Sequence, residues 1–104
     1  MDIRGGVAIV TGSATGIGAE TAKLLASRGC HVVVNYTKSH DEAEETAAAC
    51  RAFGVETILY QANVADDAQC RAMVMEATNK CQRLDVLVNN AGKTKPAPAE
   101  ISKR

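Results

Sequence analysis

Short apolar runs alternate with longer segments of helical periodicity along this sequence. Residues 7–10 and 31–35 are rich in β-branched side chains and apolar on both faces, which predicts buried strands. Residues 55–60 alternate and are rich in β-forming side chains, and a further apolar run covers residues 84–88. Helical spacing begins near Ile17 and extends to about residue 28, covers about residues 40–53, and recurs in a third segment after Asp66. The pattern predicts the element order β-α-β-α-β-α-β.

Capping residues and apolar stripes support the three helices. Gly29 is a suitable C′ residue for the first helix. The apolar stripe of this helix contains Ile17, Thr21, Leu24 and Leu25. Residues 39–42, Ser-His-Asp-Glu, have the form of a capping box for the second helix, which Gly54 closes. Asp66 is expected to cap the third helix with Gln69 at position N3. The stripe of the third helix contains Cys70, Met73, Val74, Ala77 and Cys81.

Helical crossovers between successive strands require a parallel sheet with helices on both faces. Right-handed connections and a nucleotide-binding switch point predict the strand order 3-2-1-4, with a ligand crevice between the first and fourth strands. The predicted fold class is therefore a doubly wound, Rossmann-type α/β sheet, present in part. Residues 1–95 are assigned to the N-terminal part of a single dinucleotide-binding domain.

Residues 96–104 are predicted to be a polar tail leading to a continuation that the sequence does not contain. Its last residues resemble the approach to another helix, with Ser102 as a candidate cap. In that arrangement the outer edge of the fourth strand has no partner, and bare apolar edges favour association.

Composition excludes several classes of function. The 104 residues include twelve basic and twelve acidic side chains, so no basic surface for nucleic acid is expected. The apolar runs are too short to cross a membrane, and residues 1–6 do not open a signal peptide. The four cysteines form no C-x-x-C pair and have no metal-ligand spacing with either histidine. We therefore expect no metal site and a reducing, cytoplasmic location.

A glycine-rich turn follows the first strand and opens the first helix. Strand, glycine turn and helix together present free N–H groups and a positive dipole end to a phosphate. Gly12 suits a tight turn with positive φ, Gly16 permits close approach of a ligand, and Gly18 permits close helix–strand packing. The spacing Gly-x-x-x-Gly-x-Gly is not that of a P-loop. By itself, the turn is also compatible with a tight βα connection that binds nothing.

Two motifs carry a resemblance to a known family. Residues 11–18, TGSATGIG, match the pattern TGxxxGxG, and residues 89–92 are NNAG. With both motifs in the expected order, the chain resembles the N-terminal half of the short-chain dehydrogenase/reductase family. The NY dipeptide at 35–36 and the Asn-Val pair at 63–64 are most similar to 3-oxoacyl-acyl-carrier-protein reductases and glucose-dehydrogenase-like members. The resemblance covers essentially the whole chain but not a whole family member.

The resemblance implies cofactor-binding roles in three loops. The residues expected to line the pyrophosphate and adenosine ribose are Gly12, Ser13, Thr15, Gly16, Ile17 and Gly18. Those expected against the adenine are Asn63 and Val64, and those expected behind the cofactor ribose are Asn90, Ala91 and Gly92. Asn89 is expected to tie the fourth strand into the sheet through its amide. Turn chemistry alone also accounts for Asn63 and Asn89.

The end of the second strand bears on the choice of cofactor. An enzyme that prefers NAD usually carries an acid there for the ribose 2′-OH. The residues in this region are Asn35, Tyr36, Thr37 and Lys38, none of them a carboxylate, and Thr37 and Lys38 can meet a 2′-phosphate. We therefore expect NADP(H) rather than NAD(H) as the cofactor. Lys38 is also compatible with a solvated loop charge, and Thr15 stands where NADP-preferring members often carry a basic residue.

No catalytic residue is assigned in this chain. The family uses a Tyr as the acid, with a Lys four residues later that lowers the phenol pKa. Tyr36 and Tyr60 are followed at that spacing by His40 and Val64, so the chain alone is expected to be inactive.

The leading hypothesis is an NADP(H)-dependent oxidoreductase acting on a carbonyl or alcohol, with a 3-oxoacyl thioester as the implied substrate class and only the cofactor-binding half present. When full length, it is expected to be a homo-oligomer without nucleic-acid or membrane partners. The alternative is a non-catalytic, truncated nucleotide-binding or interaction fragment. A flavin-binding electron carrier is weaker, because it leaves the NNAG turn unexplained.

Overall fold

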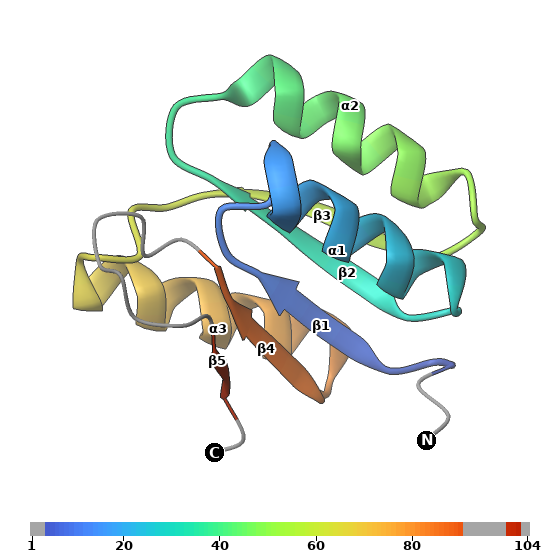
Figure 1. Cartoon of the computed structure of the whole chain (residues 1–104). Coiled ribbons are helices and arrows are strands. Elements are labelled where there is room, and N and C mark those ends of the chain that lie inside the picture. Colours follow the sequence, from blue (N-terminus) through green and yellow to red (C-terminus); the bar gives the residue numbers. More distant parts are fainter. Residues whose placement is uncertain (1–3, 91–99, 103–104) are drawn as a thin grey trace.

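The computed structural model describes residues 4–90 and 100–102, and its strands form one sheet of order β3-β2-β1-β4-β5 (Figure 1). The strands are β1 (Val7–Val10), β2 (His31–Tyr36), β3 (Thr57–Gln61), β4 (Val86–Asn89) and β5 (Glu100–Ser102). The helices are α1 (Gly16–Ser27), α2 (His40–Arg51) and α3 (Asp67–Cys81). The first four strands are parallel, so the predicted Rossmann-type order 3-2-1-4 is confirmed.

β1 is the middle strand of the five-stranded sheet and is completely buried. Helices α1 and α2 cover one face of the sheet, and α3 covers the other (Figure 1). The core on the α1–α2 side includes Val10, Val32 and Val34. The core on the α3 side includes Ile9, Val33, Met73 and Ala77. None of the described helices is long and apolar enough to cross a membrane.

The predicted buried stripe of α1 is wrong. Ile17 and Leu24 are 77% and 56% exposed, whereas Leu25 is partly buried. The residues of α1 that face the interior are small: Gly18, Ala19, Ala22 and Ala26. At Gly18 the helix lies so close to the first turn that even a Cβ atom does not fit. Helical periodicity therefore predicted the helix correctly. The flank that is buried, however, is the one with small residues and not the one with Ile17 and Leu24.

The caps of the two later helices differ from each other. Ser39 precedes α2 but its side chain makes no capping hydrogen bond, so the predicted capping box is wrong. The ψ angle of Ser39 is 64°, outside the extended region that an N-cap usually adopts. The prediction for α3 is confirmed, because Asp66 Oδ1 accepts from the Ala68 N–H at 3.0 Å and from the Gln69 N–H at 3.4 Å. Met73 and Ala77 of the predicted stripe are buried.

β5 corrects the prediction for the end of the chain. It pairs antiparallel with β4, with Val88 opposite Ile101, so the outer edge of β4 has a partner. The expected helix approach, with Ser102 as a cap, is wrong because Ser102 lies in this strand. The backbone groups of an apolar edge strand need hydrogen-bond partners, and a short strand from the predicted polar tail supplies them. Of the predicted tail, residues 96–104, the structure describes only residues 100–102.

Candidate functional site: a cleft at the carboxyl ends of the strands

The carboxyl ends of β1 to β4 meet along one edge of the sheet, as a parallel arrangement requires. The loops there enclose a cleft of about 650 Å³. Residues that line it are Gly12, Ala14, Thr15, Tyr36, Thr37, Lys38, Ser39, Asn63, Val64, Ala65 and Asn89. Seven of the predicted cofactor-binding residues are among them: Gly12, Thr15, Tyr36, Thr37, Lys38, Asn63 and Val64. The structure thus brings together residues from three loops that sequence reasoning had grouped.

The glycine turn leads into α1, whose amino end lies at this cleft and has no side-chain cap. Gly12 has a φ of 61°, as predicted, and Gly16 at the start of α1 has a φ of 63°. Thr15 precedes α1 in an extended conformation but its side chain makes no capping hydrogen bond. No acidic residue lies in the first turn of the helix. The first N–H groups and the positive end of the helix dipole are therefore available to an anion.

Gly18 is required by packing rather than by backbone conformation. A Cβ atom there would meet the Gly12 carbonyl oxygen, would lie 2.6 Å from Asn90 Nδ2, and would be 3.0 Å from the Cα of Ser13. The predicted close-packing role of Gly18 is therefore confirmed, with the glycine turn and Asn90 as the partners. At Gly16, by contrast, an added Cβ atom would meet no neighbouring atom. It is the positive φ angle that favours glycine at this position.

Ser13 faces the protein interior. Its side chain is fully buried, and its hydroxyl donates to the Val10 carbonyl at 2.6 Å. The same hydroxyl accepts from the Asn35 N–H at 3.0 Å, and the Ser13 N–H donates to the Asn35 carbonyl at 2.9 Å. Both hydrogen-bond donors of Ser13 are thus used within the protein. The structure places Ser13 under the cleft, not in its lining.

The NNAG segment contacts the glycine turn directly. The Asn90 N–H donates to Thr11 Oγ1 at 2.8 Å, and Asn90 Nδ2 donates to the Gly12 carbonyl at 3.2 Å. Thr11 Oγ1 lies 3.4 Å from Asn89 Oδ1, consistent with a role of Asn89 in joining β4 to β1. Ala91 and Gly92 of the predicted site lie outside the described residues. Asn90 therefore supports the wall of the cleft that Gly12 forms.

The wall contributed by β2 carries no carboxylate. Tyr36 is buried, and its ring lies edge-to-face with that of His40 at a centroid distance of 5.4 Å. Thr37 and Lys38 are exposed at the cleft, and Lys38 forms no ion pair within the described part of the chain. A free ammonium group beside a hydroxyl is suited to a phosphate ester.

The wall after β3 is built by turn hydrogen bonds. Asn63 Oδ1 accepts from the Ala65 N–H at 3.0 Å, and the Asn63 N–H donates to Gln69 Oε1 at 2.8 Å. Gln69 Nε2 in turn donates to the capping residue Asp66. The turn chemistry considered for Asn63 is therefore present, and the residue also lines the cleft.

The predicted cofactor-binding residues do not include Asn35, Ala14, Ser39, Ala65 or Asn89. The last four line the cleft beside predicted residues, and their adjacency to the motifs is the available signal. Asn35 is 1% exposed and hydrogen bonds to the glycine turn and to the end of β3. A polar residue that ends an otherwise apolar strand was the signal in its case, because buried amides need partners.

The resolved pKa shifts lie away from the cleft. The hydrogen bond from Arg83, followed by that from the Val7 N–H, lowers the pKa of Asp85 below its usual value near 3.8. Burial raises the pKa of Cys30 to about 11. Within residues 4–90 and 100–102 there is no group of three His, Cys, Asp or Glu side chains that could hold a metal ion.

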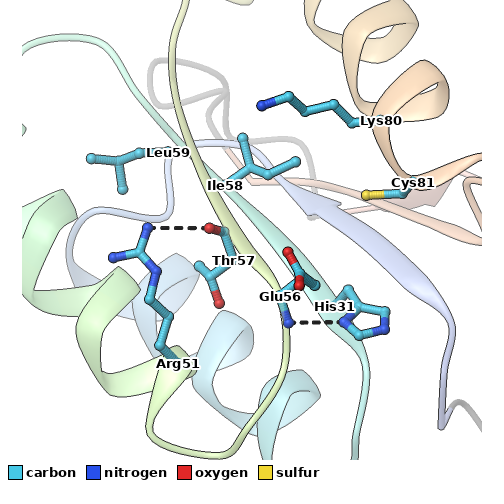
Figure 2. Close-up of a pocket in the computed structure, with 8 residues that line it drawn as sticks. All are labelled: His31, Arg51, Glu56, Thr57, Ile58, Leu59, Lys80 and Cys81. Carbon is cyan, nitrogen blue, oxygen red and sulfur yellow. Dashed lines mark hydrogen bonds between the residues drawn. The ribbon is translucent and has the colours of Figure 1, made fainter.

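A second cavity of about 690 Å³ lies beside the amino-terminal part of β3 (Figure 2). It is lined by His31, Arg51, Glu56, Thr57, Ile58, Leu59, Lys80 and Cys81. Two hydrogen bonds organise it: Arg51 Nη2 donates to the Thr57 carbonyl at 3.2 Å, and the Glu56 N–H donates to His31 Nδ1 at 2.9 Å. No predicted cofactor-binding residue lines this cavity.

Comparison with known proteins assigns the family. The profile of the family described as short chain dehydrogenase matches residues 6–103, nearly the whole chain. The chain belongs to this family. Among short-chain dehydrogenases of known structure, it is similar to one from Burkholderia cenocepacia in complex with NADP, at 38% identity and a TM-score of 0.86 over 93% of this chain and 40% of that one. A short-chain dehydrogenase from Mycobacterium avium matches at 34% identity and a TM-score of 0.82, covering 91% of this chain and 37% of that one.

Among curated relatives, the chain is similar to the 3-oxoacyl-acyl-carrier-protein reductase FabG of Staphylococcus aureus. The two are 46% identical over 88 residues, which are 85% of this chain and 36% of the relative. The chain therefore spans little more than a third of the length of the short-chain dehydrogenases it matches. The recognised family and the Rossmann-type fold are confirmed.

Proposed function

We propose that the cleft binds the adenosine and pyrophosphate portions of NADP(H), and that the protein carrying it transfers hydride between this cofactor and a carbonyl or alcohol. One observation carries the proposal: an uncapped helix N-terminus, a turn with two positive-φ glycines and the carboxyl ends of four parallel strands border one cleft. Members of this family are oxidoreductases, and the similar Burkholderia cenocepacia structure contains NADP.

The proposed pyrophosphate position is at the start of α1. The free N–H groups of the first helical turn donate to phosphate oxygens, and the helix dipole stabilises their charge. Gly12 and Gly16 adopt the positive φ angles that shape this turn. Gly18 allows the helix to lie against the turn, and Ile17, which is 77% exposed, offers apolar contact beside it. Asn90, with Ala91 and Gly92, is proposed to back the cofactor ribose.

The proposed preference for NADP(H) over NAD(H) rests on the end of β2. A carboxylate would accept from the 2′-OH of NAD and repel a 2′-phosphate. Tyr36, Thr37 and Lys38 offer an aromatic ring, a hydroxyl and an ammonium group that has no ion pair among the described residues. Asn63 and Val64 also line the cleft, and we propose that the adenine lies against them.

The substrate class proposed is a 3-oxoacyl thioester or a similar ketone. Its support is the 46% identity to a 3-oxoacyl-acyl-carrier-protein reductase over the cofactor-binding region. Protonation of the forming alkoxide needs an acid such as the family's Tyr with its Lys, and neither Tyr36 nor Tyr60 has that partner at the family's spacing. We assign this step to residues outside the present sequence. A cytoplasmic location and homo-oligomerisation of the full-length protein remain predictions.

Cofactor binding can be tested directly. The intact mass of the natural product establishes which polypeptide carries this chain, and that polypeptide is then titrated with NADPH and NADH by calorimetry. We expect NADPH to bind, and NADH to bind at least about tenfold more weakly, because one charge-assisted contact is worth about 1.5–3 kcal/mol. If neither NADPH nor NADH binds, the proposal is refuted. Equal affinities would refute only the preference.

A further inference from the structure

Asn35 joins the ends of three neighbouring strands beneath the cleft. Its side-chain Oδ1 accepts from the Gly12 N–H at 2.9 Å, just beyond β1. Its Nδ2 lies 3.3 Å from the Tyr60 carbonyl and 3.2 Å from the Ala62 carbonyl, at the end of β3 and just beyond it. Asn35 itself lies in β2, and its backbone N–H and carbonyl are both hydrogen-bonded to Ser13. A single buried residue therefore contacts both the glycine turn and the exit of β3.

These contacts require a carboxamide in one orientation. The Gly12 N–H is a donor, so the side-chain oxygen must face it, whereas the two carbonyls are acceptors and must face the NH₂ group. An aspartate would keep the acceptor for Gly12 but direct a second oxygen at the two carbonyls. An alanine would leave the Gly12 N–H and both carbonyls without these partners. An unsatisfied buried polar group is costly, so either change has a strong effect.

We propose that Asn35 is a positioning residue, which sets the separation between the glycine turn and the loop after β3 and thereby shapes the adenosine part of the cleft. Both segments line the cleft, the glycine turn with Gly12 and Thr15 and the loop after β3 with Asn63 and Val64. Asn35 is not among the residues that line the cleft, so it acts through Gly12 and Ala62 rather than by contact with a ligand. The inference rests on the proposed function, because it assumes that a dinucleotide occupies the cleft.

The proposal distinguishes Asn35 from its neighbours at the end of β2. Tyr36, Thr37 and Lys38 line the cleft and would contact the cofactor, so their replacement changes which dinucleotide is preferred. Replacement of Asn35 changes the spacing of two walls that NADPH and NADH would share. Its replacement by an uncharged residue should therefore weaken the binding of both dinucleotides by a similar factor and leave the ratio of their affinities unchanged.

The test compares Asn35→Ala and Asn35→Asp with the control Cys50→Ala in the full-length protein. Cys50 is also fully buried, lies in α2 and does not line the cleft, so its truncation reports the general effect of a lost core side chain. The dissociation constants of NADPH, NADH and 2′,5′-ADP are measured at a temperature where all variants are folded. Hydrogen exchange of the Gly12 amide is followed in parallel.

We expect both Asn35 variants to bind NADPH and 2′,5′-ADP at least about tenfold more weakly than the wild type, while Cys50→Ala binds within about twofold. The hydrogen-exchange rate of the Gly12 amide should be higher in Asn35→Ala than in the wild type, and it should be unchanged in Cys50→Ala. A wild type that binds no dinucleotide would refute the proposed function itself. If the wild type binds and the Asn35 variants match it, or weaken only as much as Cys50→Ala, the positioning role is overturned. Should Asn35→Ala fail to fold, the same criteria apply to Asn35→Asp with NADH as the ligand, because the added carboxylate would by itself repel the 2′-phosphate of NADPH and 2′,5′-ADP.

Discussion

The side-chain amide of Asn90 donates to the carbonyl of Gly12 at 3.2 Å, joining two segments that are 78 residues apart in the sequence. This contact connects the TGSATGIG turn to the NNAG segment across neighbouring strands β1 and β4. Gly18 completes it, because a Cβ atom there would lie 2.6 Å from Asn90 Nδ2. The two motifs are therefore parts of one packed unit.

Gly18→Ala should disrupt this unit. The added methyl group meets the Gly12 carbonyl and the Asn90 amide, so the free energy of unfolding should fall by about 1–3 kcal/mol. Urea unfolding measures the loss. Ala19→Gly, at the next buried position of α1, serves as a control that introduces no clash and costs about 1 kcal/mol through helix propensity. A Gly18→Ala variant as stable as the wild type would contradict the packing account.

Asn90→Ala should weaken NADPH binding by about tenfold, because the Gly12 carbonyl loses a donor and the glycine turn loses its tie to β4. Calorimetric titration measures the change. Asn79→Ala, on the exposed surface of α3, is the matched control and should bind like the wild type. Equal affinities of Asn90→Ala and Asn79→Ala would show that the tie is dispensable.

Lys38→Glu should reduce the preference for NADPH over NADH by at least about tenfold, because it replaces a cation at the cleft with a charge that repels a 2′-phosphate. The ratio of the two dissociation constants is the measurement. Lys80→Glu makes the same charge change beside the second cavity and should leave the ratio unaltered (Figure 2). If both variants shift the ratio equally, net charge and not a local contact would be responsible.

Asp85 should make the stability of the fold sensitive to acid. Its carboxylate accepts from the Val7 N–H at 2.9 Å and pairs with Arg83, and these hydrogen bonds lower its pKa below the usual value near 3.8. The stabilisation is therefore fully present above that usual value and is lost as the pH falls through the lower folded-state pKa.

Urea unfolding of the wild type and of Asp85→Asn between pH 6 and pH 2 tests this expectation. The variant should lose less stability on acidification, because it has no carboxylate to protonate at this position. Parallel pH profiles for the two proteins would contradict a stabilising role of the Asp85 carboxylate.

The four cysteines should differ in reactivity. Cys30 and Cys50 are fully buried, and burial raises the pKa of both thiols, that of Cys30 to about 11. Cys70 and Cys81 are partly exposed. Iodoacetamide at pH 8 should therefore modify Cys70 and Cys81 first, because it needs both access and thiolate. Peptide mapping by mass spectrometry follows the order, and early labelling of Cys30 in the native protein would contradict the buried placement.

The elements and their order were predictable from local patterns. Apolar runs identified the four parallel strands, and the side-chain chemistry of Asp66 identified the start of α3. These features depend on residues close in sequence, so periodicity and capping rules capture them. The sequence also predicted that the glycine turn lies beside the loops after β2 and β3, because parallel strands place their carboxyl ends on one edge of the sheet.

The tertiary structure alone decided which flank of α1 is buried, where Ser13 points, what Asn35 joins and how β4 acquires its outer partner. Ile17 and Leu24 have apolar side chains at helical spacing, yet they face outward because the inner flank must fit against Gly12 and Asn90. Asn35 finds its partners at Gly12, Tyr60 and Ala62, all more than 20 residues away. Such contacts depend on the distance between segments remote in the chain, and no local pattern encodes that distance.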